Sequence, residues 1–334
     1  WLNEICDRRS ATMTTKQHVI FGVFIPQGWK MELVSIPDPV DKWNKSVEIA
    51  QLAEKLGFDS IWVYDHFHNV PRPAHEAVFE CWTTMAAISQ RTTKIRLGQM
   101  VGCNLYREPS LLAKITSTLD VISGGRLDWG IGAGWYENEC RGYGYDFPEP
   151  KVRIAMLREC VEIVRSMWTH EETNYSGKYY NLVRGNCDPK PLQKPHPPIW
   201  IGGGGEQLTL RVVARYADYS NFGGTPEEFA RKREILKGHC AAVGRDESEI
   251  RKTWSPDIFI RRTEKEIKAA GSLSLRADPV DQWQANNLVG TVEQVTEKVQ
   301  KFIDLGCSGF IPWCADYPSS ETVELFAEVM KNFR

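Results

Sequence analysis

The sequence lacks the long apolar segment and the concentrated positive charge that mark membrane and nucleic-acid-binding proteins. No apolar run approaches the roughly 20 residues that a helix needs to span a bilayer. The net charge is -2, and no clustered run of Lys or Arg is present, whereas nucleic-acid binding usually shows a basic face or stripe. These absences predict a protein that acts on a small molecule, with no role for nucleic acid or membrane.

A disulfide framework is also missing. The nine cysteines are odd in number, and no two of them form a C-x-x-C pair. This pattern argues against structural disulfides and against a thiolate zinc site, and it fits the reduced thiols of a cytoplasmic protein. Trp1–Thr15 has no apolar core of a secretory signal. We expect residues 1–15 to be a disordered or extra N-terminal segment, and residues 16–334 to form a single domain.

What the chain does contain is a regular alternation of short apolar runs and amphipathic segments. The runs predict strands, and the periodicity of the segments between them predicts helices. The predicted strands cover 19–25, 60–64, 95–101, 126–131, 197–201, 217–221, 253–260 and 309–313, and the predicted helices cover 43–56, 75–89, 111–122, 153–168, 206–215, 226–242, 291–305 and 320–333. About eight of each is the count of a (β/α)8 TIM barrel.

An open doubly wound sheet is the other interpretation of this alternation, but the strand number and the chain length favour the barrel. Two segments do not fit the repeat, and we expect them to be insertions after strands 4 and 7. Residues 171–194 are polar and rich in Tyr, Asn and Gly, which is typical of a hairpin. Residues 261–287 are charged and weakly patterned, which predicts a mobile excursion over one end of the fold.

The strongest chemical signal is Asp65-His66-Phe67-His68, at the carboxyl end of the second predicted strand. Ligands and chemistry gather at this end in parallel α/β folds. An imidazole there can donate or accept a proton near neutral pH. Asp65 should point away from its neighbour in an extended backbone and fix the loop. A histidine without function and a His-x-His metal site are the alternatives, although the other histidines do not complete a ligand set.

Two glycine-rich strand exits are candidate binding elements. Gly130–Gly134 reads G-x-G-x-G after the fourth strand, so it is not the dinucleotide fingerprint, but its bare backbone would let a flat ring lie close. Asn138 and Glu139 then offer an amide and a carboxylate to that ligand. Gly202–Gly205 lie between a strand and a helix, an arrangement that favours a phosphate over an empty flexible turn.

Together these features resemble the bacterial-luciferase-like superfamily of flavin- and deazaflavin-dependent oxidoreductases, and most closely the branch that uses the deazaflavin coenzyme F420. The resemblance extends over nearly all of residues 19–333. Five motifs carry it, namely Gly22–Pro26, Ser60–His66, Ile122–Arg126, Gly130–Trp135 and Pro198–Gly204.

The resemblance implies a coenzyme at the carboxyl ends of the barrel strands, a homodimer, and a non-proline cis peptide at Met100-Val101. The implied catalytic residue is His66. The implied coenzyme-binding residues are Asp65, His66, Met100, Val101, Gly132, Ala133, Asn138, Gly202, Gly203 and Gly204. We expect the substrate pocket to be formed by Gln27, Trp29, Trp135 and Trp313, because large apolar rings near strand ends are suited to wall a pocket.

The resemblance therefore predicts an F420-dependent oxidoreductase that transfers a hydride between C5 of the deazaflavin and a small organic substrate, in the direction of C=C or C=N reduction. In the sugar-phosphate dehydrogenase branch a Glu stands where this chain has Trp135, so sugar-phosphate oxidation is not expected. An FMN-dependent monooxygenase on the same scaffold, a non-catalytic flavin-binding barrel and a metal-dependent hydrolase are the alternatives.

Overall fold

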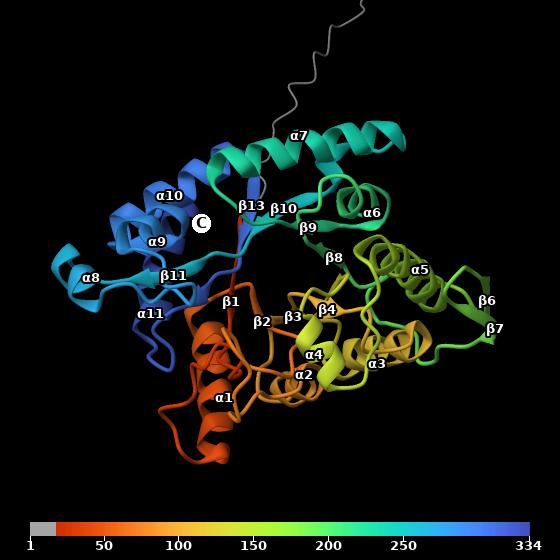
Figure 1. The fold of residues 1–334 in the computed structure, drawn as a ribbon, viewed down its shortest axis with the longest axis horizontal. Coiled ribbons are helices and arrows are strands. Elements are labelled where there is room, and N and C mark those ends of the chain that lie inside the picture. The colour runs from red at the N-terminus through yellow and green to blue at the C-terminus, as the bar shows by residue number, and fades with distance from the viewer. Residues whose placement is uncertain (1–17) are drawn as a thin grey trace, which may run out of the picture.

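Eight parallel strands close into a barrel in the computed structural model, which describes residues 18–334 (Figure 1). The strands are β1 (Ile20–Phe24), β2 (Ser60–Val63), β3 (Arg96–Gln99), β5 (Leu127–Gly132), β8 (Ile199–Gly202), β9 (Tyr219–Asn221), β10 (Arg251–Trp254) and β13 (Cys307–Phe310). Each pairs in parallel with the next, and β13 pairs with β1. The predicted TIM barrel is confirmed, and the open sheet is excluded. The predicted N-terminal segment, residues 1–15, lies outside the described residues.

Helices surround the strands (Figure 1). They are α1 (Pro39–Leu56), α2 (Cys81–Ser89), α3 (Pro109–Ile122), α4 (Glu137–Gly142), α5 (Pro150–Thr169), α6 (Thr209–Tyr216), α7 (Pro226–Ala242), α10 (Val292–Asp304) and α11 (Glu321–Met330), with short 3-10 turns η1 (Glu247–Glu249) and η2 (Lys331–Phe333). Gly57 ends α1 in the left-handed conformation, which glycine adopts without a Cβ penalty. The helix predicted over 75–89 begins only at Cys81, because the Glu80 side chain caps it by accepting the Thr83 N–H at 2.7 Å.

The insertion after the fourth barrel strand contains the predicted hairpin. β6 (Thr173–Ser176) and β7 (Asn181–Gly185) pair antiparallel. The buried carboxylate of Glu159, on α5, accepts hydrogen bonds from the N–H groups of Lys178, Tyr179 and Tyr180 at 2.9 to 3.2 Å. One carboxylate therefore ties the hairpin turn to the barrel's outer layer.

The region after the seventh barrel strand differs from the prediction. The strand expected over 253–260 is divided into two strands, because Pro256 has no N–H to donate to a continuous ladder. The first, β10, belongs to the barrel. The second, β11 (Asp257–Ile260), pairs with β12 (Leu288–Gly290) and β14 (Trp313–Cys314) in a separate three-stranded sheet. Residues 261–287 are not irregular, since they contain α8 (Glu264–Ala270) and α9 (Val280–Asn286).

Asp257 connects this second sheet to the first loop of the barrel. Its carboxylate accepts a hydrogen bond from Lys30 Nζ at 3.0 Å and one from the buried Trp283 Nε1 at 3.4 Å. The insertion is thus joined by an ion pair to the segment that follows β1.

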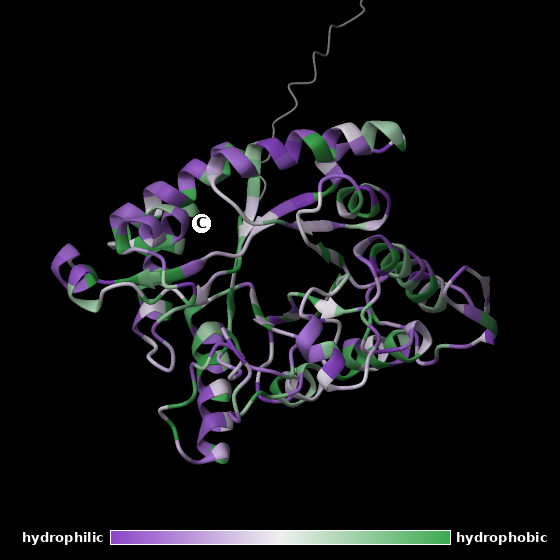
Figure 2. Ribbon diagram, viewed as in Figure 1, coloured by the Kyte–Doolittle hydropathy of each residue, from purple (hydrophilic) through white to green (hydrophobic). Residues whose placement is uncertain are grey.

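The barrel interior is packed with tryptophan. Trp62 and Trp200 are fully buried and meet edge to face, with ring centroids 4.6 Å apart, and glycines on neighbouring strands make room for Trp62. A Cβ on Gly98 would lie 2.4 Å from the ring of Trp62. Figure 2 shows hydrophilic residues along the outward α7 and α10. None of the helices within residues 18–334 has the length and hydrophobicity that crossing a bilayer requires.

The packing of Trp62 against Gly98 predicts that Gly98→Ala destabilises the protein by about 1–3 kcal/mol, because the added methyl overpacks a core with no free space. Gly238→Ala is the matched control, since Gly238 lies within α7 and a methyl added there would point into open space. It should stabilise by up to about 1 kcal/mol through helix propensity. Urea unfolding measures both, and equal midpoints for the two variants would contradict this packing.

Candidate active site

A cavity of about 370 Å³ opens at the carboxyl ends of the barrel strands. Most of the residues that the sequence singled out line it. They are Trp29, Asp65, His66, Met100, Val101, Gly132, Ala133, Trp135, Gly202 and Gly203. They come from loops after five different strands, so the barrel brings together segments that are up to 174 residues apart in the chain, from Trp29 to Gly203.

His66 is held on two sides. Its ring lies parallel to that of Trp29, with centroids 4.3 Å apart and an interplanar angle of 5°. Its Nδ1 lies 2.7 Å from Oε2 of Glu139. An ionised carboxylate can only accept, so Nδ1 carries a proton and donates it. Nε2 makes no hydrogen bond to another residue within the described chain, and this nitrogen is left available for a ligand.

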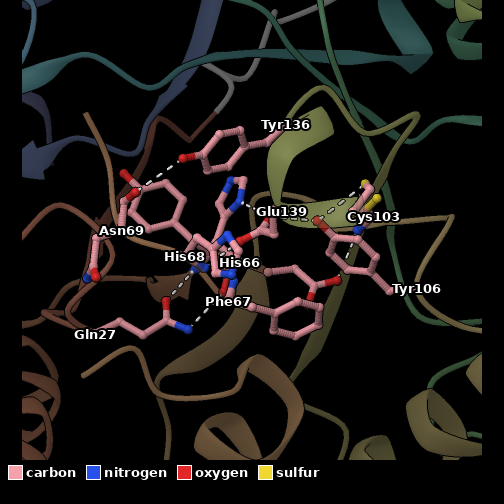
Figure 3. Close-up of polar contacts among 12 residues, drawn as sticks. Gln27, His66, Phe67, His68, Asn69, Cys103, Tyr106, Tyr136 and Glu139 are labelled. Atoms are coloured by element: carbon pink, nitrogen blue, oxygen red, sulfur yellow. Dashed lines mark hydrogen bonds and ion pairs between the residues drawn. The ribbon is translucent and has the colours of Figure 1, made fainter. Parts of the chain in front are cut away.

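Glu139 is fully buried in the first turn of α4, and it gathers four donors (Figure 3). Besides His66, the Tyr106 hydroxyl donates to Oε2 at 2.6 Å, and the backbone N–H groups of Phe67 and His68 donate to Oε1, the latter at 2.7 Å. Burial alone would raise the pKa of Glu139, but these hydrogen bonds outweigh it and lower the pKa below its ordinary value. Glu139 is therefore a carboxylate at neutral pH.

Asp65 points away from His66, as predicted, and fixes the loops around the cavity. Its carboxylate accepts both Arg107 Nη atoms, at 2.7 and 3.1 Å, and the Cys103 N–H at 2.9 Å. Arg107 also donates to Glu80 at 2.8 Å. Burial would lower the pKa of Arg107, but the Asp65 and Glu80 carboxylates raise it. Asp65 thus lines the cavity with a charge that is already compensated.

The two glycine exits and the loop after β3 form one surface of the cavity. The Met100-Val101 peptide bond is cis, as predicted. A Cβ on Gly132 or on Gly202 would lie 2.6 or 2.7 Å from a methyl of Val101, so only glycine fits at these two positions. Gly203 has φ +114°, a conformation that favours glycine. The surface is therefore bare backbone together with the Val101 side chain.

Four of the predicted site residues lie outside this lining. Asn138 is exposed at the surface of α4, and Gly204 lies beside the Lys232 side chain. Gln27 is buried, where its amide exchanges hydrogen bonds with the Tyr64 backbone at 2.8 Å. Trp313 is covered by Lys30, whose Nζ sits 4.1 Å from the ring centroid.

The structure also adds residues that the sequence did not single out. Tyr106 and Tyr136 line the cavity, as do Thr209, Asn221 and Arg153. Arg153 is the one Lys or Arg in the lining among residues 18–334. Its guanidinium lies 3.9 Å above the Phe147 ring, and its buried Nε has no hydrogen-bond partner. Its position in the first turns of α5 gave no signal in the sequence, since helix surfaces commonly carry arginine.

Within the described residues, no group of three or more His, Cys, Asp or Glu side chains is arranged to hold a metal ion. The eight cysteines within residues 18–334 are buried, and none of them forms a disulfide bond. The cavity is instead suited to an organic ligand with a flat, uncharged face, next to a histidine that can move a proton.

Most of the chain is similar in sequence to known proteins. Residues 19–272 match the family of luciferase-like monooxygenases. An F420-dependent glucose-6-phosphate dehydrogenase of Amycolatopsis mediterranei is 37% identical over 174 residues, 51% of this chain and 49% of that protein. The matched segment thus spans only about half of this relative. A protein of the same name from Segniliparus rotundus is 28% identical over 312 residues, 84% of this chain and 90% of that protein.

The fold is similar to that of an F420-dependent secondary alcohol dehydrogenase, solved in complex with an F420-acetone adduct. The TM-score is 0.79 at 22% identity, and the alignment covers 95% of this chain and 99% of that one. At this identity the similarity concerns the fold alone.

The lowered pKa of Glu139 predicts a pH-dependent stability difference between the native protein and Glu139→Gln. A carboxylate with a folded pKa below the ordinary 4.5 stabilises the protein fully above about pH 4.5, and the stabilisation is lost as pH falls through the folded value. At pH 7 the variant should lose about 2–4 kcal/mol, because buried donors lose a charged acceptor. The difference should shrink below pH 4.

Urea unfolding of both proteins from pH 7 to pH 3 measures this difference. Glu137→Gln is the control, because Glu137 is exposed two residues away on the same helix and should change stability little at any pH. If the free energies of unfolding of the native protein and Glu139→Gln differ by the same amount at every pH down to 3, then Glu139 is not the ionised acceptor described above.

Proposed function

This chain belongs to the luciferase-like monooxygenase family, and we propose that it is an F420-dependent oxidoreductase acting on a small organic substrate. Relatives named F420-dependent glucose-6-phosphate dehydrogenase support the choice of coenzyme. The observation that carries the proposal is the Glu139–His66 pair, which sits beside a glycine-floored cavity and can move a proton at Nε2.

The cavity fits a deazaflavin in two respects. A planar ring can lie against the backbone at Gly132 and Gly202, where a side chain would collide with Val101. The coenzyme's side chain is anionic, and the lining offers the Arg153 guanidinium and the backbone after β8. Asp65, Met100, Ala133 and Gly203 complete the proposed contacts. When bound, F420 supplies or accepts a hydride at C5.

His66 supplies the proton that balances the hydride. Reducing a double bond adds one hydride and one proton to the substrate, and the proton leaves Nε2 while Glu139 keeps its hydrogen bond to Nδ1. Oxidation runs the same transfer backwards. A buried carboxylate stabilises an imidazolium, which is a proton donor. The pair can serve either direction, and we propose reduction of a C=C or C=N bond as the cellular one.

The walls of the site orient the imidazole ring of His66. Trp29 stacks on one face of His66, so the imidazole cannot tilt. Tyr106 anchors Glu139 by donating to Oε2, the same carboxylate oxygen that accepts from His66. A base or acid that is held in place in this way contributes through correct orientation as well as through its proton affinity.

An FMN-dependent monooxygenase is the second candidate, since the matched family is named for that activity. Titration with F420 and with FMN separates the two, with coenzyme fluorescence as the readout. We expect binding of F420 at micromolar or lower concentration and at least 10-fold weaker binding of FMN. The reverse order would overturn the choice of coenzyme. The predicted homodimer and cytoplasmic location remain predictions, and light scattering tests the first.

The proposed role of His66 predicts that His66→Ala keeps F420 binding and lowers turnover by about 10²–10⁴-fold, the usual contribution of a positioned acid or base. His68→Ala is the matched control, because this histidine lies in the same loop but not in the cavity lining. Its turnover should stay within a few-fold of the native protein. Stopped-flow oxidation of reduced F420 measures both, and equal rates would refute the assignment.

Glu139→Gln should act through His66 and not through coenzyme binding. Without the negative charge the imidazolium loses its stabilisation, so the alkaline limb of the pH–rate profile, where this proton donor is lost, should move to lower pH while the F420 affinity is unchanged. Glu139→Asp, which restores a charge one methylene shorter, should recover part of the profile. A profile that stays in place in both variants would leave Glu139 with a purely structural role.

A further inference from the structure

The part of the cavity around His66 is walled by aromatic rings. Trp135 meets the imidazole edge-on, with centroids 5.7 Å apart, and Tyr136 does so at 6.2 Å. These two rings stack on each other at 5.1 Å with an interplanar angle of 14°. Trp29 covers one face of the histidine. Any molecule that reaches Nε2 must therefore contact several π faces and edges.

Trp135 is unusual among these rings because it lines the cavity and yet is 61% exposed. A large apolar ring left open to solvent gains free energy when another apolar surface covers it. Its partner Tyr136 holds it in a stacked pair, so little side-chain freedom remains to be lost when a ligand binds. Trp135 is thus a preformed platform beside the proton-transferring residue.

The cations near this platform are already neutralised. Lys30 pairs with Asp257 at 3.0 Å and is packed over the Trp313 ring. Arg107 pairs with Asp65 and Glu80 at 2.7 and 2.8 Å. Both side chains are only 12–13% exposed. Neither can reach an anionic substrate without abandoning a carboxylate that is itself largely shielded from water, which would leave an unpaired charge.

Arg153 is then the one basic side chain that lines the cavity within the described residues. The coenzyme proposed above carries an anionic side chain that needs such a contact. We therefore assign Arg153 to the coenzyme, and this assignment leaves no second cation in the cavity lining for a substrate phosphate. Trp135 also presents an apolar ring beside His66, so a hydroxyl-rich substrate would find no hydrogen-bond partner in that side chain's ring face.

We propose that the substrate is an uncharged molecule with a flat apolar ring that packs against Trp135 and Tyr136 and presents its reducible bond to His66. The inference rests on the proposed function for the reaction and, through the assignment of Arg153 to the coenzyme, for the substrate's lack of charge; the packing against Trp135 does not depend on it. It separates this chain from its relatives named glucose-6-phosphate dehydrogenase, whose named substrate is a charged sugar.

Binding of neutral ring compounds tests the proposal, with and without F420. Calorimetric titration with cyclohex-2-en-1-one, acetophenone and coumarin is compared with titration by glucose 6-phosphate. At least one neutral ring should bind, and glucose 6-phosphate should not. Trp135→Ala should weaken that binding about 10-fold or more, the effect of removing a central aromatic contact, and Trp135→Phe should keep most of it.

Trp43→Ala is the matched control, since Trp43 packs against Phe79 beside α2 and outside the cavity, and it should leave the affinity unchanged. Binding of glucose 6-phosphate in preference to every neutral ring, binding of no neutral ring, or equal affinities in Trp135→Ala and the native protein would each overturn the proposal.

Failure of this substrate proposal and failure of the proposed coenzyme give different results. Trp135-dependent binding of a neutral ring, in a protein that binds no F420, would support the substrate class and refute the coenzyme. Reduction of F420 by glucose 6-phosphate, in a protein that binds no neutral ring, would support the coenzyme and refute the substrate class.

Discussion

The buried carboxylate of Glu139 is the constraint on which the active site depends. A charge without solvent is tolerated only when its hydrogen-bonding capacity is filled, and here four donors fill it: His66, Tyr106 and the N–H groups of residues 67 and 68. These donors come from two loops, whereas the acceptor comes from a third segment. Displacing any one of the three leaves a charge or a donor unpaired, so the loops are fixed as a unit.

The barrel supplies what such a network needs, because it brings the carboxyl ends of β2, β3, β5 and β8 next to one another. The same neighbours build the coenzyme surface, where Val101 fits between Gly132 and Gly202. Proton transfer and ring binding therefore share a scaffold. The apolar wall at Trp135 continues directly from the glycine exit of β5, so a single strand end contributes both the floor and a side of the cavity.

Local pattern was sufficient to predict the barrel, the position of His66 and the glycine surface, because each depends on residues close together in sequence. Contacts between distant segments were not predictable in the same way. Glu139 and Asn138 are neighbours in sequence, but adjacent helical positions point about 100° apart, and only the orientation of α4 places the glutamate inside. Trp313 lies near the strand end as expected, yet Lys30 covers it from another segment.

The ion pair between Lys30 and Asp257 has an evolutionary consequence. Loops of a TIM barrel can usually be exchanged independently of one another, which is how the fold accommodates new chemistries. Here the insertion after β10 binds the residue that follows Trp29, and Trp29 stacks on His66. Replacing that insertion alone would leave Lys30 without its carboxylate partner beside Trp29, so the two loops are physically coupled.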